Sequence, residues 1–313
     1  MKPLAEVVTL YPKAPTETRI AWPLLVKTFI ALLFFAGNSI LCRWAIKDEI
    51  IDPSSFSAIR LLSAAVTLVI LYLLRFKQWK PLVTDNSIEQ WLGAGLLFLY
   101  AVCFSFAYLK LDAGLGALIL FSCVQLTMLV YTFSHEGGLN SRQWVGLIIA
   151  MAGLGYLLSP SAMRPDIQGV LLMATAGVAW AGYTLLGKRA KVSATLLTTK
   201  QFLLTLCLVV PFFILNLPMM MLSPSGVGLA IVSGAVTSGV GYLVWNSVLP
   251  QLQALTAGVI QLTVPVMAML LGAIMLTEWP SLHNLLASIV IIIGVGCIVC
   301  ANVSLGKRAQ RSA

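Results

Sequence analysis

Charged residues are scarce in this 313-residue sequence, and acidic ones are the scarcest. Asp and Glu number 11, there are two histidines, and charged residues make up 10% of the chain, against about 25% in ordinary soluble domains. Apolar residues make up 59%, and the mean hydropathy is +0.94. A soluble enzyme of this size could not bury so much apolar surface, and a disordered chain would be far more polar. The composition therefore indicates a helical protein embedded in lipid.

Motifs that carry catalysis or metal binding are missing as well. The sequence has no H-E-x-x-H, no G-x-S-x-G and no phosphate loop. Its six cysteines all lie in apolar stretches, including the C-x-x-C pair Cys297 and Cys300, and are interpreted as packing thiols. We therefore expect no catalytic residue, no bound metal and no other cofactor.

Ten apolar segments approach the roughly 20 residues that a helix needs to cross a bilayer. They cover residues 23–45, 54–75, 90–110, 112–133, 143–160, 167–188, 194–216, 225–248, 253–276 and 281–303. The sequence thus predicts an all-α integral membrane protein with ten transmembrane helices. The boundaries at 110–112 and 248–253 are the hardest to place, because apolar sequence continues through them.

Most of the 20 Lys and Arg residues lie before the first predicted span or after an even-numbered one. Because cytoplasmic connections are enriched in Lys and Arg, this pattern places both termini in the cytoplasm of a multi-pass protein of the cytoplasmic (inner) membrane. Residues 1–22 then form a cytoplasmic tail, and residues 304–313 form a basic one. The same distribution explains the net charge of +9 without a nucleic-acid partner.

The two halves of the chain resemble each other at a shift of about 140–145 residues. The matches are residues 37–43 with 182–188, residues 112–130 with 253–271, Glu136 with Glu278, and Gly153 and Gly155 with Gly294 and Gly296. A unit of five spans crosses the membrane an odd number of times, so its second copy is inverted. We predict two inverted five-helix repeats, residues 23–160 and 167–303, which could open alternately to either side.

These features resemble the EamA-type branch of the drug/metabolite transporter superfamily. The resemblance covers about residues 25–303 and rests on the two repeats, on the Glu136 and Glu278 pair preceding Gly-rich last helices, and on residues 37–39 through 58–62. It implies a carrier in the cytoplasmic membrane, often an exporter of amino acids or other small metabolites, that works without ATP. The small multidrug branch uses a glutamate in its first helix, and the first predicted span here has no acidic residue.

Two cations, Arg60 and Lys200, lie about six residues inside predicted spans, whereas the other cations are assigned to connections, tails and span ends. A charge at such a depth costs a few kcal/mol unless it pairs, faces water or reaches the headgroups. One interpretation is that each draws an anionic or zwitterionic substrate from one gate. The other is that both are structural and reach headgroups, a carboxylate or a carbonyl.

Uncharged polar side chains and two tryptophans far from any span end are the other candidates for substrate binding. They are Asn38, Tyr100, Gln125, Trp180, Tyr183, Trp245, Asn246 and Gln261. Amides and hydroxyls in lipid need partners, so they face the bundle interior or water. We expect a wet polar hollow where the two halves meet. Ordinary interhelical hydrogen bonds, worth about 0.6 kcal/mol each, are the alternative.

The interpretation that combines these features is a secondary transporter for a small polar metabolite. It would export an amino acid or a related anionic or zwitterionic compound by alternating access, as a monomer or homodimer whose partners are the metabolite and membrane lipids. A membrane-embedded enzyme and a non-transporting receptor or scaffold are the alternatives. No carboxylate relay crosses the predicted spans, which favours facilitated transport or exchange.

Overall fold

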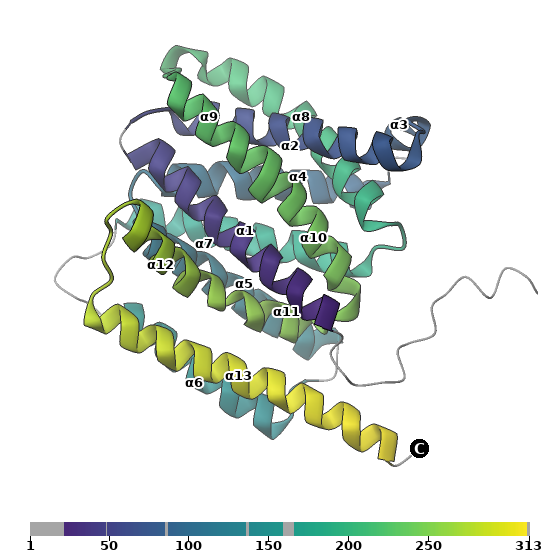
Figure 1. Ribbon diagram of the computed structural model, residues 1–313, viewed down its shortest axis with the longest axis vertical. Helices are drawn as coiled ribbons and strands as arrows, with labels where there is room; N and C mark the ends of the chain where they lie inside the picture. Colours follow the sequence, from purple (N-terminus) through teal and green to yellow (C-terminus); the bar gives the residue numbers. More distant parts are fainter. Residues whose placement is uncertain (1–21, 48, 85–86, 136–137, 159–165, 312–313) are drawn as a thin grey trace, which may run out of the picture.

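The computed structural model describes residues 22–47, 49–84, 87–135, 138–158 and 166–311, and no strand occurs in these ranges. The helices lie side by side in one bundle (Figure 1). Within these ranges, eight helical runs of 20 to 28 residues are long and apolar enough to cross a membrane. The prediction of an all-α membrane protein is confirmed.

The helix bounds agree with the predicted spans to within a few residues at most ends. The elements are α1 (Trp22–Lys47), α2 (Pro53–Phe76), α3 (Lys80–Val83), α4 (Ile88–Ala107), α5 (Ala113–His135), α6 (Ser141–Leu158), α7 (Ile167–Arg189), α8 (Ala194–Asn216), η3 (Leu217–Met219), α9 (Pro224–Val232), η4 (Ser233–Val240), α10 (Gly241–Val248), η5 (Leu249–Gln251), α11 (Ala254–Gln261), α12 (Thr263–Met275) and α13 (Leu282–Arg311). Predicted spans 143–160 and 281–303 correspond to α6 and α13.

Three features differ from the sequence prediction. The span predicted at 225–248 is α9, η4 and α10 in succession, and η4 is a π-helix. The span predicted at 253–276 divides into α11 and α12, because Pro265 has no N–H for the carbonyl of Gln261. Helix α13 continues to Arg311 through the predicted 304–313 tail, whose Leu, Lys, Arg and Ala residues are good helix formers.

Side-chain caps fix where five of the long helical runs begin. Asp52, Ser87, Asp166, Ser193 and Ser223 each lie just before a helix, and the side chain of each accepts a backbone N–H of the first turn. Such caps satisfy N–H groups that have no partner within the helix. They therefore fix the residue at which each of these helices begins.

Helices of the two predicted repeats contact each other in corresponding pairs. Helix α4 packs on α7, and α9, η4 and α10 pack on α1; α2 packs on α8, α5 on α11 and α12, and α6 on α13. Figure 1 shows α6 and α13 together along one side of the bundle. A two-fold relation between the halves would produce this pairing.

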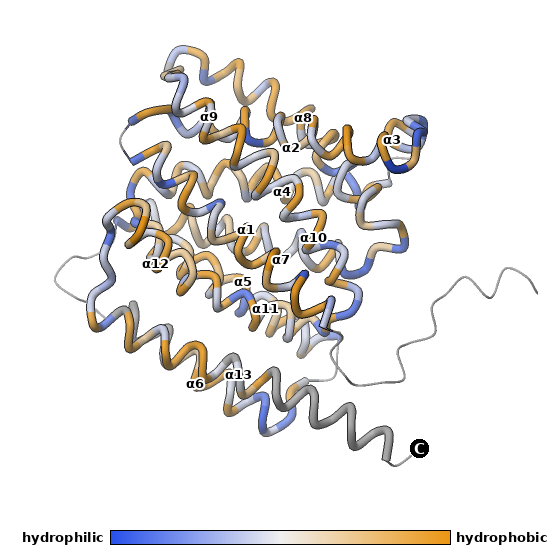
Figure 2. The backbone as a smooth tube through the Cα atoms, viewed as in Figure 1, coloured by the Kyte–Doolittle hydropathy of each residue, from blue (hydrophilic) through white to orange (hydrophobic). Residues whose placement is uncertain are grey.

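The connections gather at two ends of the bundle. At the first, here the Asp52 end, Asp52 contacts Met221 and Lys110 pairs with Asp166 at 3.4 Å. At the second, the Thr84 end, Lys200 donates to the carbonyl of Thr84. Figure 2 shows that hydrophilic segments concentrate at these ends, while the lengths of the helices are mostly hydrophobic. The start of α1 and the end of α13 lie at the same end of the bundle (Figure 1).

Asp52 ties two connections together, and we predict that Asp52→Asn lowers stability by about 1 kcal/mol, the usual cost of losing a helix cap. Its carboxylate accepts the N–H of Ser55 and that of Met221, each at 2.9 Å. Burial opposes ionisation, but hydrogen bonds from Ser54, Ser55 and Met221 outweigh it and hold the pKa of Asp52 below its ordinary value.

The pH dependence of this effect follows from the lowered pKa. The stabilisation that ionised Asp52 provides is fully present at pH values above the pKa that Asp52 has in the unfolded chain. It is lost as the pH falls through the lower pKa that Asp52 has in the folded protein. Thermal unfolding in detergent at several pH values should therefore show a gap between wild type and Asp52→Asn that closes below about pH 4. Glu89→Gln, at an exposed carboxylate, is the control. A gap that persists at the lowest pH would contradict the assignment.

Candidate functional site

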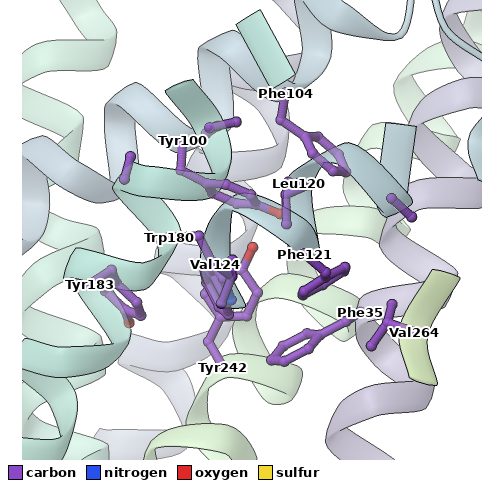
Figure 3. Close-up of a cluster of buried hydrophobic side chains, with 14 of the residues drawn as sticks. Phe35, Tyr100, Phe104, Leu120, Phe121, Val124, Trp180, Tyr183, Tyr242 and Val264 are labelled. Carbon is purple, nitrogen blue, oxygen red and sulfur yellow. The ribbon is translucent and has the colours of Figure 1, made fainter. Parts of the chain in front are cut away.

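Trp180 of α7 lies at the centre of a cluster of aromatic rings (Figure 3). Its ring centroid is 5.1 Å from that of Phe35 on α1, 5.1 Å from Tyr100 on α4 and 4.7 Å from Tyr242 on α10. Its indole N–H donates to Oε1 of Gln261 on α11 at 2.7 Å. Trp180 therefore contacts helices from both predicted repeats, at the place where the halves meet.

Asn38 of α1 organises a polar cluster beside these rings. Its Oδ1 accepts the hydroxyl of Ser233 at 2.7 Å and lies 3.3 Å from that of Thr237, both on η4. Its Nδ2 donates to the Tyr100 hydroxyl at 3.2 Å, and Nη1 of Arg60 lies 3.5 Å from Oδ1. The two predicted residues Asn38 and Arg60 are thus brought together, with Tyr100 joining the polar cluster to the aromatic one.

Arg60 is a buried cation with an unusually poor set of partners. Its side chain is 1% exposed, and its good hydrogen bond goes from Nη2 to the carbonyl of Ala101 at 3.1 Å. Nε has no hydrogen-bond partner. The guanidinium carbon lies 5.3 to 5.9 Å from the ring centroids of Phe104, Tyr100 and Phe56.

No carboxylate among the described residues forms an ion pair with Arg60; the ion pairs there involve other cations. A buried charge normally needs a counter-ion or a full set of hydrogen bonds. Stacking on aromatic faces recovers only part of that cost. The site therefore has one unneutralised positive charge, which an anionic group of a ligand could neutralise.

The second predicted repeat contributes a neutral cluster. Asn246 of α10 donates to the Tyr183 hydroxyl at 3.0 Å and to that of Thr198 at 2.9 Å. Oδ1 of Asn246 has no partner, and neither does Nε1 of Trp245, which is fully buried and 5.5 Å from Phe35 between ring centroids. These groups could serve as an acceptor and a donor for a polar ligand.

Two predicted site residues lie apart from this constellation. Lys200 is buried, and it donates to the carbonyl of Thr84 at the end of the bundle, so its ammonium group lies at that end and not beside Arg60. Gln125 is buried against Gly258 of α11, and neither atom of its amide group has a hydrogen-bond partner. The structure thus favours the structural interpretation for Lys200 and gives Gln125 no contact with the Asn38 cluster.

Several residues of the constellation escaped sequence reasoning. Phe35 and Tyr242 complete the aromatic cluster, and Ser233, Thr237 and Ser238 bring hydroxyls to Asn38. Residues four apart share a face in an ordinary α-helix, but the residue five positions on joins them where the helix is widened to a π-helix, as in η4; such widening often marks a functional site. That spacing was the available signal.

The expected wet hollow is not what the structure has at the centre. Trp180, Tyr183, Tyr242 and Trp245 are each at most 2% exposed, because their rings fill the space between the halves. A cavity of about 300 Å³ lies instead at the Asp52 end, and Arg43 and Glu278 are among its lining residues. The other glutamate of the predicted pair, Glu136, lies outside the described residues.

Comparison with known proteins identifies the family. Residues 167–300 match the model of the EamA-like transporter family. An uncharacterized protein of Pseudomonas aeruginosa is 39% identical over 92% of this chain and 98% of its own. An uncharacterized transporter of Archaeoglobus fulgidus is 24% identical over 85% of this chain and 93% of its own, and the uncharacterized transporter YwfM of Bacillus subtilis is 26% identical over 86% and 90%. The chain belongs to the EamA-like transporter family.

The EamA-like fold is shared with a solved crystal structure. The alignment with that crystal structure covers 89% of this chain and 98% of the solved chain, with a TM-score of 0.73 at 20% sequence identity. The resemblance inferred from the sequence is thus confirmed, and this EamA-like protein is a multi-pass membrane transporter. The names of its relatives point to transport rather than catalysis.

Proposed function

We propose that this EamA-like protein is a secondary carrier that exports a small anionic or zwitterionic metabolite, such as an amino acid, by alternating access. The observation that carries the proposal is Arg60, a buried guanidinium with no ion-pair partner among the described residues. Retaining such a charge inside a membrane protein is costly. A ligand carboxylate that forms hydrogen bonds with Arg60 would offset this cost.

The binding site, in this proposal, is formed by both repeats, residues 23–160 and 167–303. Arg60 and Asn38 hold the anionic group, and Tyr183, Trp245 and Asn246 contact the remainder. Trp180 would have to move when the ligand enters, since its ring now occupies the centre. The pairing of α4 on α7 with α9, η4 and α10 on α1 supports two halves that rock about such a site.

The Thr84 end faces the cytoplasm in this proposal, and the Asp52 end faces outward. The basic residues near the Thr84 end support this orientation; they include Arg75, Lys77, Lys80, Lys188, Arg189 and Lys191. The membrane is then the cytoplasmic one, with both chain ends inside.

The membrane potential supports export of an anion. A potential that is negative inside drives a net negative charge outward by about 2.3 kcal/mol per 100 mV. Among the described residues, Glu89 lies in the exposed first turn of α4, and no acidic residue lies deeper in a span where it could carry a coupled proton. Facilitated efflux would therefore need no further energy source.

The test is counterflow into proteoliposomes that contain the purified chain and no nucleotide. The solutes are L-glutamate, L-threonine, L-lysine and glucose, each labelled. We expect saturable counterflow of L-glutamate or L-threonine, and none of L-lysine or glucose. For an anion, an inside-negative diffusion potential should accelerate efflux. A folded sample that moves none of the four solutes, or all of them alike, would refute the proposed specificity.

A further inference from the structure

The cavity at the Asp52 end has a charge distribution unlike that of the central cluster. Its charged lining residues are Arg43 and Lys47 of α1, Asp112 before α5 and Glu278 after α12, and Trp279 lies beside them. Its volume of about 300 Å³ is at the lower end of small-ligand sites. Two cations and two carboxylates make the lining neutral overall but strongly dipolar.

Arg43 connects the walls of this cavity. Its Nε lies 3.3 Å from Oε1 of Glu278, and its Nη2 lies 3.1 Å from Oδ1 of Asp112. Its Nη1 donates to the carbonyl of Tyr108 at 2.8 Å. Lys47 adds a second contact to Oε1 of Glu278 at 3.3 Å. Because α1 belongs to the first predicted repeat and Glu278 to the second, these ion pairs join the two halves where the proposed carrier must open outward.

Solutes can reach these groups. The side chains of Asp112, Lys47 and Glu278 are 70%, 38% and 17% exposed, and that of Arg43 is 11% exposed. A carboxylate entering the cavity would compete with Glu278 for Lys47 and Arg43. An ammonium group would compete with Arg43 for the carboxylates.

We propose that this cavity is a second binding site, selective for small dipolar ions, and that a bound ligand replaces the ion pair between Arg43 and Glu278. The ammonium group of the ligand lies between Asp112 and Glu278, and its carboxylate lies beside Lys47. A simple anion or cation satisfies half of the lining and leaves the other half paired as before. The inference rests on the proposed function in one respect, that the ligand is the transported solute.

Binding can be measured without transport. Trp279 lines the cavity and is 78% exposed, so its fluorescence should report occupancy in the reconstituted full chain. The probes are L-threonine, lactate and ethanolamine at equal ionic strength. We expect a saturable change with L-threonine at concentrations where lactate and ethanolamine have no effect, and loss of that signal in Trp279→Phe.

Two variants test the charged groups, and one serves as the control. Glu278→Gln should raise the half-saturating concentration of L-threonine at least tenfold, and Lys47→Gln about fivefold. Lys110→Gln breaks an ion pair at the same end outside the cavity and should leave it unchanged. Equal responses to the three probes, or unchanged half-saturation in both Glu278→Gln and Lys47→Gln, would overturn the proposal.

The same measurement on Arg60→Gln separates the two proposals. If both hold, this variant loses flux but keeps the L-threonine response. Wild-type protein that binds L-threonine but moves no solute refutes the carrier proposal alone. Protein that transports normally without the Trp279 response refutes the second site alone.

Discussion

Arg60→Gln should lower the flux of an anionic or zwitterionic solute roughly tenfold to a hundredfold. That range corresponds to the about 1.5–3 kcal/mol that a hydrogen bond to a charged group contributes. Glutamine keeps the possibility of a hydrogen bond to the carbonyl of Ala101 but removes the charge that a ligand carboxylate would contact. Initial rates of counterflow at several solute concentrations are the measurement.

The stability of this variant should change in the opposite direction, or not at all. A buried charge with no counter-ion is unfavourable in the unliganded protein, so its removal should leave the thermal midpoint unchanged or raised. If Arg60 were only structural, Arg60→Gln would lower the thermal midpoint, and the loss of flux would follow from a loss of folded protein. Arg60→Lys should recover part of the flux, because lysine keeps the charge but not the planar fork.

Lys200→Gln is the matched control, since it also removes a buried cation from a span. The Lys200 ammonium group contacts the carbonyl of Thr84 at the end of the bundle. Its loss should therefore change flux less than threefold. Unchanged flux in Arg60→Gln, or equal losses in both variants, would mean that Arg60 has no special role.

The spans could be predicted because lipid requires a long apolar run for each crossing and satisfies no backbone group itself. The predicted span at 194–216 coincides with α8, and the predicted span at 167–188 ends one residue before the end of α7 at Arg189. The same logic found Trp180 and Trp245, since tryptophans away from span ends have no headgroup to contact. The contacts of Trp180 with four other helices depend on tertiary packing, which a one-dimensional pattern does not contain.

Side-chain direction is what the sequence could not supply. Arg60 and Lys200 lie at similar depths in their helices, yet the first is held among aromatic rings and the second reaches a loop carbonyl. A flexible lysine can extend to the surface, whereas the broad guanidinium of Arg60 stacks on rings. Likewise, the apolar run at residues 225–248 predicts one continuous helix, and only the spacing of the hydroxyls at Ser233, Thr237 and Ser238 hints at the π-helix η4.

Gly234 at the start of η4 should be the glycine least tolerant of substitution beside the site. A Cβ atom there would overlap the carbonyl oxygen of Arg60 as well as the Ser63 hydroxyl. The hydroxyl can rotate away, but the carbonyl is part of the α2 backbone. Gly234→Ala should therefore push α2 and η4 apart, at a cost of about 1–3 kcal/mol, and displace Arg60 with them. Both the thermal midpoint and solute flux should fall.

Gly93 provides the comparison, because the shift that aligns residues 112–130 with residues 253–271 also aligns Gly93 with Gly234. The three atoms that a Cβ at Gly93 would meet first all belong to the side chain of Gln201 on α8, which can adopt another rotamer. Gly93→Ala should thus cost less than Gly234→Ala, and Gly228→Ala, which meets nothing within 4 Å, should cost nothing measurable. If Gly234→Ala were as stable and active as Gly228→Ala, the close contact of η4 with α2 could not be what holds Arg60 in place.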